Sequence, residues 1–373
     1  MSTKRALAWR IMFICFLIAP TILFVALKDK LPAMDYENKE KMSFPLITAE
    51  SYESYPVELS EYYDEHMPFR NQMVALNNYG LYKLFYDSAS TQVLLGKNRF
   101  MFYDNPEDGT NVLDYKGFAY FSPEHLAQVG YNLMETERLL AEKGCEFWVL
   151  IVPDKDHVYS ENMPDYIAGP NYSRASGLLD YLSENTDVKV IYPLPELLVQ
   201  KEEYEDQALY YHYDTHWNDL GAYVGVKRLL DAMGLPSSSL WELTLTQNNK
   251  SEYDLADLLC IREFLHDDEG YDIEDPMWGE ATLLEEAEFG TIRYVSDNPE
   301  TDPRKVLFIR DSFGEQALPY FARHFRETVS ERRDHSFIYA TQDEILTREK
   351  PDIFVLEISE RYLSYLLAWR YYL

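Results

Sequence analysis

Four short apolar runs, separated by segments with helical signals, constrain the fold of this chain most strongly. The runs are FWVLIVP (147–153), VKVIYPL (188–194), KVLFI (305–309) and IFVLEI (353–358). A run without polar alternation is typical of a strand that is buried on both faces. Helical segments lie between the runs, near residues 176–184, 220–233, 316–325 and 342–348. The alternation predicts an α/β fold of three layers, with a mostly parallel central sheet between helices.

Local signals place further elements before the first run. The sequence VLLGKNRFMFY (93–103) predicts a hairpin, and the region from about 52 to 86 has a helical pattern. Ser122 followed by Pro123 is a strong helix start, and Gly144 is a strong stop. We therefore expect one long helix directly before the strand at 147–153.

The N-terminus carries a segment that does not belong to a soluble core. The 17 residues from Ile11 to Leu27 contain no charge, and cationic residues at positions 4, 5 and 10 precede them. About 20 apolar residues span a bilayer as a helix, and flanking cations favour the cytoplasmic side. We predict an uncleaved, single-pass anchor in the cell membrane with a cytoplasmic N-terminus and an extracytoplasmic domain. A cleaved signal peptide is the alternative, although residues 25–30 offer no convincing cleavage site.

These patterns predict three regions and exclude some functions. We expect a cytoplasmic tip and anchor at 1–30, a linker at 31–61 and a domain at 62–373 with an acidic excursion at about 236–304. The 34 basic and 64 acidic residues give a net charge of −30, which argues against a nucleic-acid partner. The three cysteines have no zinc spacing, and free thiols are expected. No cofactor and no metal are expected.

The segment YYHYDTHWNDLGAY (210–223) holds the first candidate for chemistry. Asp214 and His216 are two residues apart, so in an extended backbone their side chains face the same side. In a Ser-His-Asp site the carboxylate fixes the tautomer of the imidazole, which then takes a proton from the serine. A structural Asp-His pair at a helix start is the alternative interpretation.

The segment KVLFIRDSFGEQALPYF (305–321) holds the second candidate. A buried strand leads into Ser312, and a helix follows, so Ser312 lies at the carboxyl end of a parallel strand. Sites in open α/β sheets form at that edge, and the helix N-terminus offers N–H groups for a developing oxyanion. The alternative is that Ser312 only caps the helix.

Taken together, these motifs resemble a known family. DTHW followed by a Gly-Ala helix, a strand ending in RDSFG, PDKDHVY (153–159), EHMPFRN and GKNRFMFY are similar to the SGNH-hydrolase-like domains of the alginate O-acetyltransferase family, of the AlgX/AlgJ type, and their DHHW-type bacterial relatives. The resemblance extends from about residue 62 to the end. Two departures are Arg310, where the broader SGNH hydrolases have glycine, and the Asp-His pair preceding the serine in the chain.

The resemblance implies a function and roles for particular residues. It implies an extracytoplasmic O-acetyltransferase that moves acetyl groups onto polysaccharide hydroxyls through an acetyl-serine, beside a membrane-bound O-acyltransferase that supplies them. Ser312 would be the nucleophile, His216 the base and Asp214 the orienting carboxylate. The second oxyanion donor is unassigned.

Four further residues are weaker candidates for substrate binding: Arg310, Lys155, Tyr159 and Trp217. For Arg310 we favour an ion pair with Asp311 or Glu357, for Lys155 a solvated side chain, and for Trp217 packing under His216 rather than stacking on a sugar.

Other classes of function remain open from the sequence. Water attack would make the same triad an acetylesterase. His212, Asp214 and His216 lie on one face of an extended segment, which suits a metallohydrolase, although no further ligand cluster supports it. A noncatalytic polysaccharide assembly protein is the third alternative.

Overall fold

The computed structural model describes residues 3–31, 34, 42–48, 51–107, 109, 111–169, 172–286, 291–332 and 340–369. These residues form two compact units. One comprises Met1–Ser90 with Ala256–His266, and the other comprises Thr91–Leu255 with Asp267–Leu373. The division differs from the predicted boundary at residue 62, because the helical region before residue 91 groups with a short segment from the acidic excursion.

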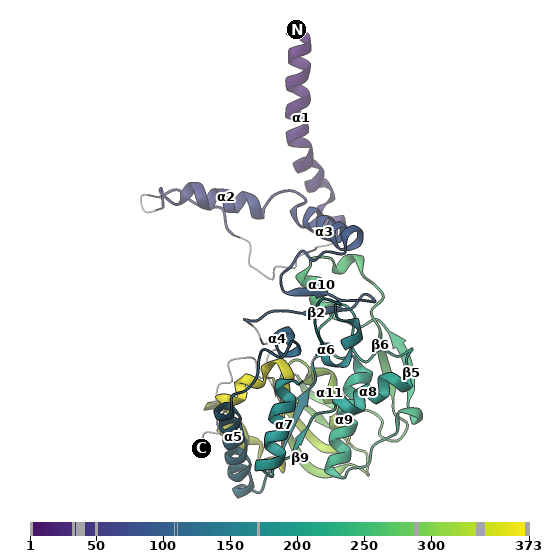
Figure 1. The fold of residues 1–373 in the computed structure, drawn as a ribbon. Helices are drawn as coiled ribbons and strands as arrows, with labels where there is room; N and C mark the ends of the chain where they lie inside the picture. The colour runs from purple at the N-terminus through teal and green to yellow at the C-terminus, as the bar shows by residue number, and fades with distance from the viewer. Residues whose placement is uncertain are drawn as a thin grey trace. The chain divides into compact units, whose positions relative to one another are not determined.

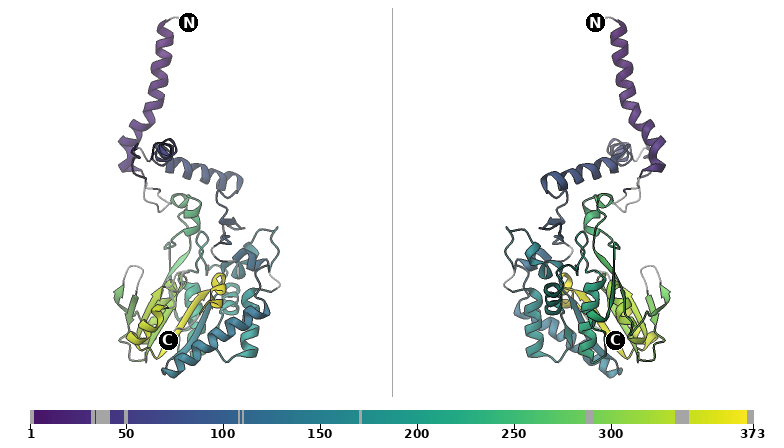
Figure 2. Two further views of the ribbon diagram at one scale, coloured as in Figure 1. Left: turned by 90° about the vertical axis from the view of Figure 1, so that its left-hand side faces the viewer. Right: turned by 90° about the vertical axis from the view of Figure 1, so that its right-hand side faces the viewer.

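The first unit is helical. It contains α1 (Thr3–Leu27), α2 (Tyr55–Glu65) and α3 (Arg70–Gly80), and α3 continues into a π-helical turn at Leu81–Phe85. The segment 256–266 packs here, since the Asn78 amide donates to the Leu259 carbonyl at 2.9 Å and the rings of Tyr79 and Phe264 stack at 4.5 Å. Figure 2 shows α1 as one continuous helix. Its stretch Arg5–Leu27 is long and apolar enough to cross a membrane. A signal sequence near an N-terminus meets the same criterion of length and composition.

The second unit is built on a sheet of seven strands in the order β4-β3-β11-β9-β10-β8-β7. Five of these strands are parallel: β3 (Glu146–Val152), β4 (Val190–Ile191), β9 (Asp302–Arg310), β10 (Phe325–Arg332) and β11 (Ile353–Ser359). The antiparallel strands β7 (Thr282–Glu286) and β8 (Thr291–Val295) extend one edge. The four predicted strands and the mostly parallel sheet are confirmed.

Helices cover both faces of this sheet (Figure 1). Alternate side chains of β3 point to opposite faces, and each set is buried under helices. Trp148, Leu150 and Val152 belong to one core with α8 (Leu194–Glu203), α9 (Asp219–Met233) and α11 (Gly314–Ala322). Phe147, Val149 and Ile151 belong to the other core with α5 (Pro123–Glu142), α7 (Arg174–Asn185) and α12 (Ala340–Glu349). The strand is therefore buried on both faces, and the three-layer prediction is confirmed.

Smaller elements complete the second unit. They are the predicted hairpin β1 (Val93–Leu95) and β2 (Met101–Tyr103), the ribbon β5 (Thr244–Asn248) and β6 (Gly270–Glu274), and the short helices α4 (Asn111–Tyr115), α6 (Lys155–Val158) and α10 (Asp254–Leu258), the last of which runs into the first unit. The acidic excursion thus contributes two ribbon strands and two sheet strands, which its weak periodicity concealed.

The predicted signals of α5 have the expected geometry. The Ser122 hydroxyl accepts from the backbone N–H of His125, and Gly144 has a φ of +74° in the left-handed region that favours glycine. The three cysteines are free thiols, as predicted.

Candidate active site

Three neighbouring parallel strands carry the candidate site at their carboxyl ends. β9 ends at Arg310 and is followed by Asp311 and Ser312, while β11 ends at Ser359 beside β3. Because these strands run in the same direction, the segments that follow them gather at one edge of the sheet. The segment with Asp214 and His216 precedes α9 and is held by an isolated bridge between Tyr210 and Trp217.

The three residues predicted as nucleophile, base and orienting carboxylate meet. His216 Nε2 lies 2.9 Å from Ser312 Oγ, and His216 Nδ1 lies 2.7 Å from Asp214 Oδ1. An ionised carboxylate only accepts hydrogen bonds, so Nδ1 carries the ring proton and Nε2 accepts from the Ser312 hydroxyl. Ser312 is half-buried. This is the geometry of a Ser-His-Asp site.

The charges within the pair favour a basic imidazole. Burial acts to raise the pKa of Asp214, but the His216 charge and hydrogen bonds from the His216 ring and N–H lower that pKa to about 2. Burial acts to lower the pKa of His216, and the Asp214 charge and hydrogen bond outweigh it and raise the pKa. His216 therefore binds a proton more strongly than a free imidazole does, which suits a general base.

A second carboxylate, Asp254, lies beside the Asp214–His216 pair. It is 40 residues after Asp214 in the sequence, and its backbone N–H donates to Asp214. It accepts from the N–H and the hydroxyl of Thr215, and its Oδ2 lies 3.6 Å from His216 Nδ1. Burial and the nearby Asp214 charge raise the pKa of Asp254 to about 6. Sequence reasoning missed this residue, because α10 begins with it in the acidic stretch and nothing local marks it.

Trp217 packs against the turn that carries the nucleophile. Its side chain is fully buried, and the indole N–H donates to the Phe313 carbonyl at 2.8 Å. A Cβ on Gly225 would lie 2.7 Å from the indole ring, so glycine on α9 is what makes room for it. Trp217 is therefore packed as the first interpretation expected, although against Phe313, and the buried ring leaves no face exposed for stacking on a sugar.

The turn around Ser312 is fixed by the carboxylate of Asp311. That carboxylate accepts from the N–H of Phe313 at 2.8 Å and the N–H of Ser359 at 2.7 Å. The N-cap residue of α11 is Phe313 rather than Ser312, and the Ser312 hydroxyl meets the His216 ring instead, so capping does not account for this serine. Within the described residues, the N–H groups of Ser312 and Gly314 have no hydrogen-bond acceptor.

Arg310 is not placed to bind substrate. It is buried beneath the turn, its guanidinium donates to the carbonyl of Asp311 and the hydroxyl of Ser330, and it pairs with Glu315 at 3.3 Å. The predicted ion pair of Arg310 exists, but its partner is Glu315 on the first turn of α11 rather than Asp311 or Glu357. The substrate-binding alternative is wrong because the charge is enclosed.

Lys155 is buried rather than solvated. Its ammonium donates to the carbonyls of Asp214 at 2.6 Å, Tyr211 at 3.0 Å and His212 at 3.3 Å. Burial lowers its pKa to about 8, against the opposing effect of nearby carboxylates. The prediction of a solvated lysine is wrong, and the side chain instead fixes the backbone of the segment that presents His216.

The three ligands suggested for a metallohydrolase do not converge. His212 Nδ1 lies 3.3 Å from Asp268. Among the described residues, the group close enough to share an ion is Asp214, His216 and Asp254, which omits His212. The His216 ring uses both nitrogens in contacts with Asp214 and Ser312. The geometry therefore favours acyl chemistry over the metal alternative.

Arg361, directly after β11, is a further residue that the sequence did not reveal. Its Nε donates to Asp154 at 2.8 Å, and its guanidinium carbon lies 5.0 Å from the centre of the Phe313 ring. The Phe313 ring in turn lies 4.7 Å from the His216 ring. A cation thus stands next to the base, where it acts against protonation of His216.

The fold and this site are similar to those of SGNH hydrolase-like domains. A family model described as "SGNH hydrolase-like domain, acetyltransferase AlgX" matches residues 93–254, which confirms the resemblance over that range. No curated protein sequence gives a match to this chain.

Three solved structures are similar. PatB1 of Bacillus cereus with a sulfonyl adduct shares 16% identity and a TM-score of 0.51, covering 74% of this chain and 99% of that one. The O-acetyltransferase domain of Pseudomonas putida AlgJ has 17% identity, a TM-score of 0.47 and coverage of 73% and 92%. A DHHW family protein from Eubacterium siraeum has 13% identity, a TM-score of 0.48 and coverage of 74% and 94%. At such identity the PatB1 match shows a shared fold.

Proposed function

We propose that this protein is an O-acetyltransferase that acetylates hydroxyl groups of a polysaccharide through an acetyl-serine intermediate. One observation carries the proposal: the Ser312 hydroxyl lies 2.9 Å from an imidazole whose other nitrogen lies 2.7 Å from a carboxylate. The acetyltransferase-like family match over residues 93–254 supports acetyl as the group transferred.

In the first step, Ser312 Oγ attacks the carbonyl carbon of an acetyl ester while His216 Nε2 takes the hydroxyl proton. The bond to the donor's alcohol oxygen breaks, and that oxygen receives the proton from His216. Asp214 stabilises the imidazolium between these events. The N–H groups of Ser312 and Gly314 are the oxyanion donors that we propose.

In the second step, a sugar hydroxyl loses its proton to His216 and attacks the acetyl-serine. The Ser312–acetyl bond breaks, and the proton returns to Ser312 Oγ. Water in place of the sugar would give net ester hydrolysis, so exclusion of water decides between transferase and esterase.

The location and partners follow from the N-terminal helix as part of the same proposal. Uncleaved, α1 would anchor the domain at the outer face of the membrane, with the N-terminus in the cytoplasm. A membrane-bound O-acyltransferase would then supply acetyl groups. N-terminal sequencing of the mature protein tests the anchor, and loss of about the first 26 residues, the length of a signal peptide, would contradict it.

Replacement of the nucleophile tests the chemistry. The full-length protein is incubated with p-nitrophenyl acetate, and acetylated Ser312 is sought by peptide mass spectrometry after acid quenching. We expect Ser312→Ala to lose the adduct and about 10⁴-fold or more of the hydrolysis rate, as serine removal does in triad enzymes. Ser183→Ala, at an exposed serine on α7, is the matched control. Undiminished acetylation by Ser312→Ala would refute the proposal.

A further inference from the structure

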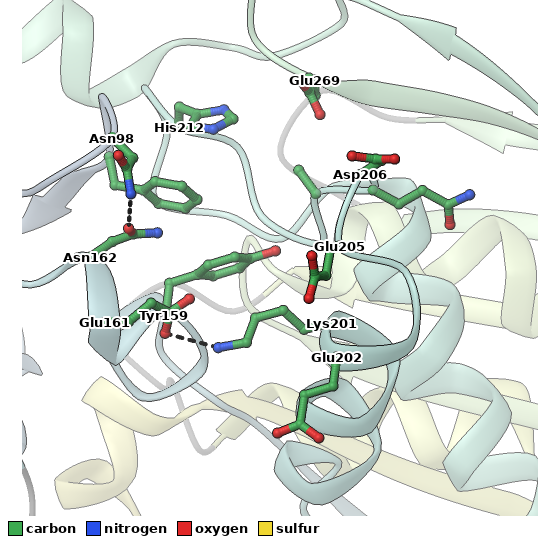
Figure 3. A pocket seen from close by; sticks show the side chains of 13 residues that line it. Asn98, Tyr159, Glu161, Asn162, Lys201, Glu202, Glu205, Asp206, His212 and Glu269 are labelled. Carbon is green, nitrogen blue, oxygen red and sulfur yellow. Dashed lines mark hydrogen bonds and ion pairs between the residues drawn. The ribbon is translucent and has the colours of Figure 1, made fainter.

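A cavity of about 610 Å³ lies beside the segment that carries the triad histidine. Its lining includes Phe100 directly before β2, Tyr159 and Asn162 from the turn after α6, His212, and the polypeptide that follows α8 (Figure 3). The volume is in the range of small-molecule sites.

The cavity shares a wall with the triad segment. The Lys155 ammonium donates both to the carbonyl of His212 in the cavity wall and to the carbonyl of Asp214. Asn218, which caps the helix after His216, donates its amide to the carbonyls of Ala208 and Glu269 in the same wall. A ligand in the cavity would therefore contact the frame that presents His216.

Carboxylates dominate the charge of the cavity. Glu161 is paired with Lys201 at 2.9 Å. The four other acidic residues of the lining have no ion-pair partner among the described residues: Glu202, Glu205, Asp206 and Glu269. Four unpaired negative charges in one concavity repel an anionic ligand and attract a cationic one.

Three buried polar side chains in the lining have unused hydrogen-bonding atoms. Tyr159 is 6% exposed, and its hydroxyl accepts from the Leu209 N–H at 2.9 Å without a described acceptor for its own proton. Asn162 is 5% exposed and uses its oxygen to accept from Asn98, leaving the amide N–H groups unpaired. The His212 side chain is 11% exposed, with Nδ1 on Asp268 and Nε2 without a partner in the described structure. Figure 3 shows the His212 and Tyr159 side chains extending toward the open space.

These unpaired atoms lie at the cavity surface, so a ligand in the cavity would supply their hydrogen-bond partners. The donors here suit the hydroxyl oxygens of a sugar, and the rings of Phe100 and Tyr159 suit its apolar face. The carboxylates suit a positive substituent. We propose that this cavity binds an amine-bearing sugar unit of the acceptor glycan. That the sugar belongs to the acceptor rests on the proposed acetyl transfer, whereas its binding in the cavity does not.

Binding to a protein unable to acetylate tests the cavity separately from the chemistry. Full-length Ser312→Ala in detergent micelles is titrated calorimetrically with triglucosamine, with its N-acetylated trimer and with a uronic acid trimer. We expect triglucosamine to bind at least tenfold more tightly than the N-acetylated trimer, and the uronate not to bind. Equal affinity for all three trimers, or preference for the uronate, would overturn the proposal.

Variants of the lining locate the binding. Glu205 and Asp206 are exposed, so Glu205→Gln with Asp206→Asn should fold, and it should weaken triglucosamine binding at least tenfold. Glu203→Gln, at an exposed carboxylate that ends α8 and lies outside the lining, is the matched control and should bind as the parent does. Unchanged binding by the double variant would also overturn the proposal. Acetylation of Ser312 in the wild type is measured in parallel, so absence of the acyl-enzyme refutes the chemistry and absence of trimer binding refutes the cavity.

Discussion

The segment from 212 to 216 contains two histidines, each paired with a carboxylate, and the two pairs differ in one respect. His212 Nδ1 faces Asp268, and His216 Nδ1 faces Asp214, so each ring has its proton directed to a carboxylate. Only His216 meets a hydroxyl at Nε2, because Ser312 reaches it from the end of β9. An Asp-His pair is therefore not a catalytic unit by itself, and the strand that delivers the serine makes the difference.

The largest expected contrast comes from changing each ring. His216→Gln should lower kcat/KM for p-nitrophenyl acetate by about 10⁴-fold or more, because the proton acceptor for Ser312 is lost. His212→Gln should lower it by about tenfold at most, since His212 touches no group of the triad. Steady-state kinetics on both proteins measure the contrast, and comparable losses would remove the distinction between the pairs.

Removal of the charge on the triad carboxylate should have the next largest effect. Asp214→Asn should lower kcat by about 10³- to 10⁴-fold, because the amide fails to hold the productive tautomer and to stabilise the imidazolium. The variant should keep a small residual activity. Rates within tenfold of the wild type would mean that Asp254 or another group orients the ring instead.

The pH profile sharpens the comparison further. His216 must be neutral to accept a proton, and its pKa is raised, so kcat/KM should increase with pH up to a value above the ordinary histidine pKa of about 6.5. Asp254→Asn removes a charge that contributes to this raised pKa, so the acid limb should move to lower pH by less than about one unit. An acid limb that stays in place or moves to higher pH would contradict the contribution of Asp254.

Replacement of Asp268, the carboxylate of the other pair, should have the smallest effect on activity and should lower stability instead. Asp268 accepts from the N–H groups of His212 and Tyr213 while nearly fully buried. Asp268→Ala leaves these donors unpaired and should cost about 2 kcal/mol of unfolding free energy. Chemical denaturation measures this cost, and Asp267→Ala at the exposed neighbour is the control.

The sequence predicted the parts of this molecule whose signals are local. Four apolar runs became strands, and Ser122 and Gly144 delimit a helix as their capping chemistry requires. The triad residues were also identified, because both motifs stand directly beside predicted strand and helix ends. Their roles in catalysis remain a prediction that the kinetic experiments test.

Properties set by distant segments were beyond such reasoning. Lys155 lies in a polar stretch that resembles a surface loop, and only the fold shows that three carbonyls surround its ammonium. Asp254 and Arg361 likewise acquire their places through contacts across the fold. β10 and the strands of the acidic excursion were missed because polar residues interrupt their apolar pattern.

The position of β11 in the sheet has a consequence for biosynthesis. This strand is the last one among the described residues, yet it separates β3 from β9. A nascent polypeptide that has emerged only as far as the serine holds every triad residue but lacks the central strand that brings the two halves of the sheet together. Folding into an active form must therefore await the synthesis of β11, and chains that end before residue 353 should lack the assembled sheet.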